Sequence, residues 1–113
     1  LNIDEMKKAA AFLVGEHDFS CFRGSMCQAK SPIKTIEYLQ IDEIDDDLII
    51  KVKANAFLHH MVRNIVGTLL KIGREEEKPE WMLLVLDSKD RKEAGPTAEP
   101  QGLYFIKAHY QTL

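Results

Sequence analysis

The order of predicted helices and strands indicates an α+β fold, in which helices pack on one face of an antiparallel sheet. Residues 33–44 and 47–54 have the composition of two strands and are separated by an acidic turn. A long, mostly apolar helical segment, residues 56–72, follows them, and a strand-like run, residues 102–110, comes last. The 113 residues suffice for one core but hardly for two, so we expect a single domain over residues 1–113.

The first predicted element is a helix over residues 4–14, which ends at Gly15. Residues 15–32 follow as an irregular loop, because Gly, Ser and Pro interrupt any regular pattern and two Phe would anchor the segment to the core. The helix is expected to bury one face, which is formed by Met6, Ala9, Ala10 and Leu13.

The two predicted strands differ in how clearly apolar and polar side chains alternate along them. In residues 47–54 the apolar side chains alternate with Lys51 and Lys53, as expected for a strand with one buried face. Residues 33–44 are rich in Ile, Tyr and Leu but alternate less clearly. The lysines of the second strand can pair with Glu37 of the first or simply face water.

The long helix is predicted from Ala56 to Ile72, with Asn55 as its N-cap and Gly73 just after its end. A second, short helix over residues 79–87 begins at Pro79, which suits a first helical position. The charged residues, two Pro and one Gly of the segment 88–101 then predict a loop before the last strand.

The composition, with 45% hydrophobic and 29% charged residues, is that of an ordinary globular protein. No apolar run approaches the roughly 20 residues of a membrane span, and the first residues do not resemble a signal peptide. We therefore expect a cytoplasmic protein that does not bind membranes. In that compartment Cys21 and Cys27 are expected to be reduced thiols rather than a disulfide.

The net charge of −3 at first argues against a nucleic-acid partner, but five of the acids lie close together in the sequence. Without those five acids the chain holds 15 basic and 13 acidic residues, so a basic face elsewhere remains compatible with the composition. The cluster is expected at the far end of the strand hairpin and consists of Asp42, Glu43, Asp45, Asp46 and Asp47.

Arg63 lies at the border between the apolar and polar arcs of the predicted long helix, over the turn that carries His60. Its side chain either extends from the helix edge to water or forms a partly buried guanidinium that needs a carboxylate or phosphate partner. Gly67, four positions on, has no side chain to cover it, and no acid lies three or four positions away. A partner would have to come from across the fold or from another part of a longer chain.

The segment from Asn55 to Gly67, N-A-F-L-H-H-M-V-R-N-I-V-G, resembles the N-x-F-L-x-x-M-V-R-x-[IV]-x-G segment of TruA-type tRNA pseudouridine synthases. The F-S-C-F-R run that ends at Arg23, and the S-P pair after it, resemble the family's loop before its central hairpin. The D-R-K-E-A-G-P-T-A run from Asp90 and the G-L-Y run from Gly102 resemble its C-terminal segment. The resemblance therefore covers essentially all of the chain.

This resemblance implies isomerisation of uridine to pseudouridine in the anticodon arm of tRNA, at tRNA positions 38 to 40, without a metal or an organic cofactor. It implies an aspartate nucleophile in an R-T-D-A-G-V-H-A segment, which the chain lacks, so the chain corresponds to a C-terminal half without the nucleophile. Arg63 then matches the arginine that pairs with that aspartate. Asp90 matches a later motif and is not expected to be the nucleophile. The family is commonly a homodimer.

Four further residues are candidates for binding the substrate. Leu103, with Tyr104 beside it, is the candidate apolar wall against the uracil, although packing in the core explains either residue equally well. Arg23 can contact phosphate or the wall of the site, or be a solvated loop arginine. His60 and the adjacent His59 are expected to point about 100° apart on a helix, which disfavours a shared metal ion.

The sequence leaves two hypotheses open, one for an enzyme and one for a protein without catalytic activity. In the first, the chain is the half of a pseudouridine synthase that supplies the arginine and part of the pocket wall. In the second, it is a stand-alone RNA-binding or protein-interaction module without catalysis.

Overall fold

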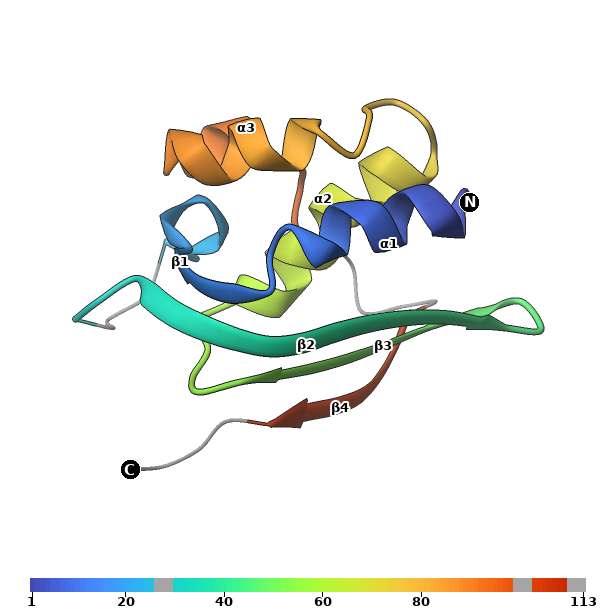
Figure 1. Cartoon of the computed structure of the whole chain (residues 1–113), viewed down its shortest axis with the longest axis horizontal. Coiled ribbons are helices and arrows are strands. Elements are labelled where there is room, and N and C mark those ends of the chain that lie inside the picture. The colour runs from blue at the N-terminus through green and yellow to red at the C-terminus, as the bar shows by residue number, and fades with distance from the viewer. Residues whose placement is uncertain (26–29, 99–102, 110–113) are drawn as a thin grey trace.

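A computed structural model describes residues 1–25 and 30–98 fully and the backbone of residues 103–109, and in this part three α-helices lie on one face of a four-stranded sheet (Figure 1). The chain order is α1 (Ile3–Ala11), β1 (Gly15–Asp18), η1 (Ser20–Phe22), β2 (Ile33–Ile44), β3 (Asp47–Ala54), α2 (Met61–Gly73), α3 (Trp81–Ser88), η2 (Arg91–Glu93) and β4 (Leu103–His109), where η marks a 3₁₀ helix. The predicted α+β class, with helices on one face of the sheet, is confirmed.

Helix α1 begins where the side chain of Asn2 accepts a hydrogen bond of 3.2 Å from the backbone N–H of Glu5. It ends at Ala11, three residues before the predicted end, because the chain turns at Phe12 and enters β1 at Gly15 with a positive φ of 103°. The predicted buried face is confirmed, since all four side chains are at most 1% exposed: Met6, Ala9, Ala10 and Leu13.

The segment 15–32 is more regular than its sequence suggests. Residues Gly15–Asp18 form β1, which pairs antiparallel with the first residues of β2. Four residues, three of them polar, are too few to reveal a period of two, and only pairing with β2 makes them a strand. The predicted anchoring by aromatic side chains is confirmed, because Phe19 and Phe22 are fully buried.

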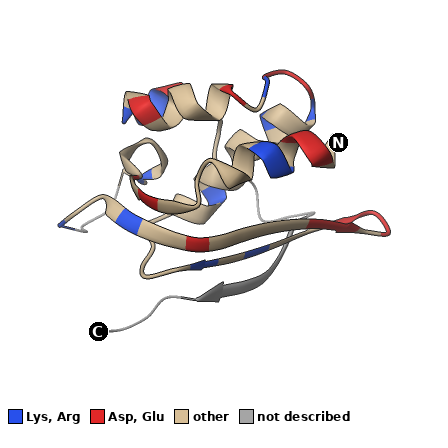
Figure 2. Ribbon diagram, viewed as in Figure 1, with Lys and Arg blue, Asp and Glu red and all other residues tan. Residues whose placement is uncertain are grey.

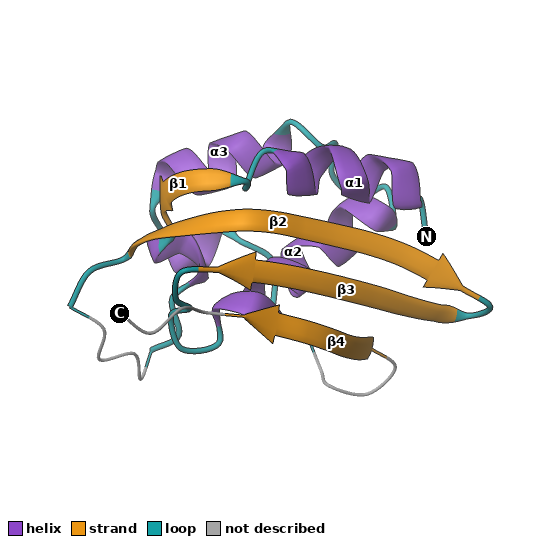
Figure 3. Ribbon diagram, turned by 60° about the horizontal axis from the view of Figure 1, so that its bottom comes forward, coloured by secondary structure: helices purple, strands orange, loops and turns teal. Residues whose placement is uncertain are grey.

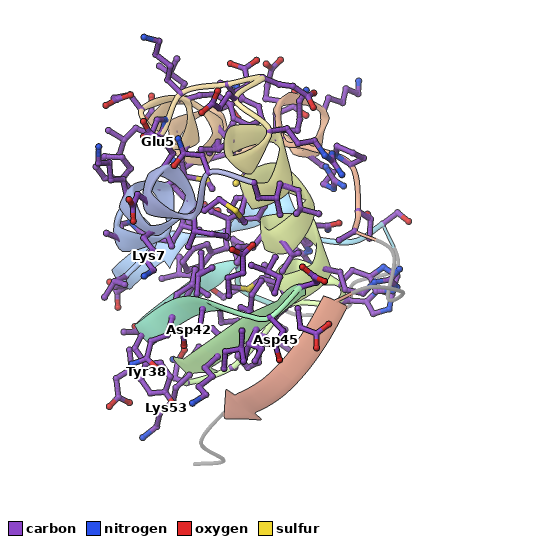
Figure 4. All side chains as sticks on the ribbon, turned by 90° about the vertical axis from the view of Figure 1, so that its right-hand side faces the viewer. Glu5, Lys7, Tyr38, Asp42, Asp45 and Lys53 are labelled. Carbon is purple, nitrogen blue, oxygen red and sulfur yellow. The ribbon has the colours of Figure 1, made fainter. Side chains whose placement is uncertain are left out.

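Strands β2 and β3 form the predicted hairpin, whose turn includes Asp45 with a positive φ of 56°. Their register puts Tyr38 opposite Lys53 on the face away from the helices, and Figure 4 shows both side chains on that side. Lys53 pairs with Glu37 across the hairpin at 3.2 Å. The opposite face meets the helices and contributes to the core Ile36, Ile41, Leu48, Ile50, Val52 and Ala54.

The last strand differs from the predicted antiparallel pattern. Strand β4 pairs with β3 in parallel, with Leu103 opposite Leu48 and Lys53 opposite His109 (Figure 3). Both strands run in the same direction because the chain crosses the helical layer between them through α2 and α3. The antiparallel arrangement therefore holds for β1, β2 and β3.

The long helix starts five residues later than predicted, at Met61 instead of Ala56. Asn55 does not cap it: its side chain accepts from the backbone N–H of Thr35 at 2.9 Å, and its own N–H donates to the Thr35 carbonyl. His60 then adopts a left-handed backbone with φ 60°, which a helix cannot contain. The tie to the sheet therefore overrides the helical pattern of residues 56–60.

Helix α3 begins at Trp81, two residues after the predicted start at Pro79. In Figure 1 it lies on the side of α1 and α2 that faces away from the sheet. The buried side chains of the helices and of the sheet form one cluster. Within the described part of the chain, no helix has the length and apolar character that crossing a membrane requires.

Candidate functional site

Arg63 lies in the first turn of α2 and is held by Ala98, which comes after α3 in the chain. Its Nε donates a hydrogen bond of 3.1 Å to the carbonyl of Ala98. In return, the N–H of Ala98 donates to the carbonyl of Arg63 at 3.0 Å. The two residues thus hold each other through both backbone and side chain, which fixes one edge of the guanidinium and leaves its Nη end directed away from this contact.

No carboxylate among the described residues forms an ion pair with Arg63, since the ion pairs there join Lys8 to Glu5 and Lys53 to Glu37. Arg63 is exposed rather than partly buried in this chain. Of the two interpretations that the sequence left open, this chain therefore agrees with the first, in which the Arg63 side chain extends from the helix edge to water. Its Nη groups have no partner in the part of the chain that the structure describes, so they are available to an anion from outside it.

Gly67 also has a packing role that its sequence position did not suggest. A Cβ atom on Gly67 would lie 1.6 Å from the carbonyl oxygen of Pro96 and 3.1 Å from the N of Ala98. Arg63 is exposed, and Gly67 has in addition a role in packing. It lets the backbone of residues 95–98 lie directly on α2, which brings Ala98 within reach of Arg63.

A second close contact one residue along strengthens this docking. The N–H of Gly95 donates to Thr68 Oγ1 at 2.9 Å, and that hydroxyl donates to the carbonyl of Asn64 at 2.9 Å. A Cβ on Gly95 would lie 2.8 Å from the Cα of Thr68, so only glycine permits this approach. Arg91 Nη1 closes the segment by donating to the Gly95 carbonyl at 2.7 Å.

Asn64, the neighbour of Arg63, is 1% exposed and is the centre of a polar network. Its Oδ1 accepts from Arg91 Nη2 at 3.0 Å and from Thr97 Oγ1 at 2.5 Å. Its Nδ2 donates to the carbonyl of Phe22 at 2.8 Å, and Arg91 Nη2 also donates to Thr97 Oγ1 at 3.1 Å. A buried amide without these partners would destabilise the fold, so the network fixes η1 and the segment 91–97 to α2.

The two histidines before α2 do not lie as an unbroken helix would place them. The rings of His59 and His60 stack with centroids 3.9 Å apart and planes at 23°, so the expected 100° separation is wrong. The left-handed backbone of His60 causes the difference. Desolvation, followed by the charges of His59 and Arg63, lowers the pKa of His60, so its imidazole is neutral at pH 7.

Arg23, His60 and Arg63 are brought to the same end of α2. Gly24, the residue after Arg23, donates its N–H to the carbonyl of His59 at 2.8 Å. Arg23 itself is half-buried and caps η1 through its backbone N–H, while the Asn64 network ties the preceding Phe22 to α2. The Arg63 guanidinium and the neutral His60 imidazole thus lie at this end, with the backbone of Arg23 and Gly24 beside them, which suits an anionic ligand.

Leu103 and Tyr104 are placed only by their backbone, in β4 opposite Leu48 and Ile49. Their side chains lie outside the described residues, so their part in a pocket wall stays a prediction.

Asp90 has a structural contact of its own. Its carboxylate accepts a hydrogen bond of 2.9 Å from the N–H of Lys92 and so caps η2.

The acidic cluster occupies the hairpin end of the sheet, as predicted (Figure 2). Asp42 and Asp45 lie there, and Thr35, which is tied to Asn55 just before α2, lies at the other end of β2. Seven residue steps along β2 separate Thr35 from Asp42, the acid of the cluster nearest to it, or roughly 23 Å. This exceeds the screening length of about 8 Å at physiological salt, so the cluster has little effect on an anion at the Thr35 end of β2.

The surroundings of three lysines bear on whether their side chains can contact phosphate. Lys53 pairs with Glu37, and the Nζ of Lys71 lies 5.5 Å from the ring centre of Trp81. Lys51 lies on the open face of the sheet and forms no ion pair within the described residues. The side chain of Lys107 lies outside the described residues.

Cys21 does not offer a reactive thiolate. Cys21 is a free, fully buried thiol, and burial raises its pKa to about 12. Cys27 lies outside the described residues. No group of three or more His, Cys, Asp or Glu in the described ranges is arranged to hold a metal ion.

The sequence predicted Arg63 but missed the residues that hold it. Asn64, Arg91 and Thr97 had been given no role, and Ala98 belonged to a predicted loop. One usable signal was Gly67, since a glycine inside an otherwise apolar helix often marks a close approach of another backbone. The Gly95-Pro96 pair, which occurs in a segment without regular structure, is its counterpart.

The chain was also compared with known proteins. A family model described as tRNA pseudouridine synthase matches residues 9–111. Curated relatives named tRNA pseudouridine synthase A are 51% identical in Nitrosococcus oceani and 49% identical in Photobacterium profundum, each over 110 residues. The match covers 97% of the chain and 42% of each relative, so the chain spans about two fifths of their length. Together these matches show that the chain belongs to the tRNA pseudouridine synthase family.

Proposed function

We propose that this chain is the C-terminal half of a synthase that converts uridine to pseudouridine in the anticodon arm of tRNA, at tRNA positions 38 to 40. The observation that carries the proposal is Arg63: its Nε is held by Ala98, and its Nη end has no partner among the described residues. In a family member, that arrangement suits a carboxylate supplied by the rest of the protein.

In this proposal the nucleophile is an aspartate of an R-T-D-A-G segment, which does not occur in the 113 residues. The target uridine leaves the helical stack, and the carboxylate then attacks it. Over the whole reaction the bond between N1 and the sugar breaks, a bond from C5 to the same sugar carbon forms, and the proton lost from C5 is balanced by one gained at N1. The carboxylate must stay ionised in a site that excludes much of the water. The guanidinium of Arg63 favours that charged form.

The remaining candidates form the surroundings of the base and its backbone. Leu103 and Tyr104 are proposed to wall the uracil. Arg23 and His60 are proposed to contact the RNA next to it, since both lie at the end of α2 that carries Arg63. The site as proposed needs no metal and no organic cofactor.

We further propose that the complete protein is cytoplasmic and forms a homodimer. The contact is proposed to lie within residues 74–90, which include Trp81. Trp81 is only half-exposed, whereas Leu83 and Leu84 of α3 are 45% and 71% exposed and are better suited to a partner. Light scattering of the complete protein is expected to give twice the monomer mass, and a monomer at micromolar concentration would exclude the dimer.

The proposed function is tested with tRNA transcripts that carry uridine at positions 38, 39 or 40, followed by digestion and mass spectrometry. The complete protein is expected to form pseudouridine at these positions, whereas purified residues 1–113 form none because the nucleophile is missing. Turnover by the isolated residues 1–113 would contradict the missing nucleophile. Tight tRNA binding by the complete protein without any pseudouridine would favour the alternative, an RNA-binding module.

A further inference from the structure

We propose that Asn64, Arg91 and Thr97 form a positioning network that sets the direction of the Arg63 guanidinium through Ala98. The network does not touch the reacting atoms. It holds the carbonyl of Ala98 where Arg63 Nε must donate to it, so that the Nη end alone receives the anion. This inference rests on the proposed function of Arg63 and adds three residues to it.

The first step of the argument is the direct link between network and carbonyl. Thr97 precedes Ala98, and its hydroxyl is bonded to both Asn64 Oδ1 and Arg91 Nη2. Asn64 in turn follows Arg63 on α2 and is buried. The segment 97–98 is thus fixed, on consecutive residues, to the same turn of helix that carries the arginine.

The second step is the number of donors that the arginine has left. A guanidinium has five N–H groups in a rigid plane, and the Nε–H of Arg63 is used by Ala98. Fixing this edge restricts the rotation of a long side chain that is otherwise exposed. A carboxylate can then bind in a bidentate way at the Nη1–Nη2 end, with less loss of side-chain entropy.

The third step is that the close approach leaves little freedom for the segment. Gly67 and Gly95 bring its backbone into contact with α2, and Arg91 Nη1 fixes the Gly95 carbonyl. A network whose only purpose was to close the surface over the core would not need to end on the arginine. The network here reaches both, since Asn64 bonds to the buried Phe22 on one side and Thr97 precedes the Ala98 that bonds to Arg63 on the other.

Thr97→Val in the complete protein tests the proposal, with Thr97→Ser as the matched control. Thr97 is exposed, so the change opens no cavity, and Arg91 can still donate to Asn64. We expect Val to lower kcat about tenfold, as for one lost hydrogen bond in an aligned site, with KM for tRNA almost unchanged. Ser keeps the hydroxyl and is expected to retain the wild-type kcat.

A readout that a merely structural role would not change is the pH dependence of kcat. If Val loosens Arg63, the carboxylate loses part of its counter-charge and its pKa rises, so the acidic limb of the profile moves to higher pH. In protein labelled with ¹⁵N-arginine, the Nε proton of Arg63 is also expected to exchange faster with water in the Thr97→Val variant than in the Thr97→Ser variant.

The outcomes separate the positioning network from the proposed function. A Val variant with an unshifted acidic limb and an unchanged Nε exchange rate overturns the network, even if its stability is lower. An Arg63→Ala variant with near-normal turnover overturns the proposed function instead. If Arg63→Ala is inactive and Val shifts the limb while Ser does not, both stand.

Discussion

Arg63→Ala is expected to lower kcat of the complete protein by roughly 10²–10⁴-fold, while the affinity for tRNA remains almost unchanged. Removing one partner of a desolvated charge pair typically costs about 3–5 kcal/mol, and each 1.4 kcal/mol corresponds to a tenfold change in rate. Affinity is largely retained because most of it comes from contacts along the phosphate backbone. Single-turnover kinetics together with filter binding measure the two quantities separately.

Arg63→Lys is expected to be poor as well, although it keeps the charge. Arg63 performs two tasks at once, because Nε bonds to the Ala98 carbonyl while the Nη end is left for the carboxylate. A lysine has one nitrogen, which cannot form the fork and reach Ala98 at the same time.

The matched control for both variants is Arg74→Ala. Arg74 follows α2 directly and is exposed at the opposite end from Arg63. Its loss removes the same charge from the same helix, so a general electrostatic effect on tRNA binding would be seen in both variants. Near-normal turnover of Arg63→Ala, or an equal loss in Arg74→Ala, would show that Arg63 has no special role.

Gly67→Ala is expected to have the second-largest effect, on stability and activity together. The added Cβ would lie 1.6 Å from the carbonyl oxygen of Pro96, a backbone atom, so residues 95–98 must move away from α2. Overpacking of this severity is expected to lower the free energy of unfolding by about 3 kcal/mol or more. Because Ala98 moves with the segment, kcat should fall even at temperatures where the protein stays folded.

The control is Gly73→Ala in the same helix. A Cβ on Gly73 would meet the Sδ of Met6 at 2.6 Å and the side chain of Leu1 at 3.1 Å, and these side-chain atoms can shift. Alanine also favours helix by up to about 1 kcal/mol, so we expect the free energy of unfolding to change by less than that. Urea titration of both variants gives the comparison; equal stability of Gly67→Ala and wild type would contradict the docking.

Much of the fold could be predicted because its signals are local. The alternation around Lys51 and Lys53, the buried face of α1 and the acidic turn each arise within a few residues. The start of α2 could not be predicted in this way. Asn55 is a good helix cap by type, but its hydrogen bonds go to Thr35, twenty residues earlier, and only the assembled sheet provides that partner.

The same limit separates Arg63 from the residues that hold it. Its position at the border of an apolar helix and its match to a family motif both follow from the sequence. Its bond to Ala98 spans 35 residues, and the network behind it joins Asn64 to Arg91 and Thr97 over 27 and 33 residues. Such pairings leave no periodic pattern, and the local signs of them were Gly67 and the Gly95-Pro96 pair.

The central claim is that Arg63 is the counter-charge of a carboxylate that lies outside this chain. It is tested most directly by ¹³C NMR titration of the aspartate of the R-T-D-A-G segment in the complete protein, with Arg63 present and in Arg63→Met. An adjacent arginine lowers the pKa of an aspartate by about 1–3 units. We therefore predict that the pKa of this aspartate rises by about that amount in Arg63→Met, whereas an unchanged pKa would contradict the pairing.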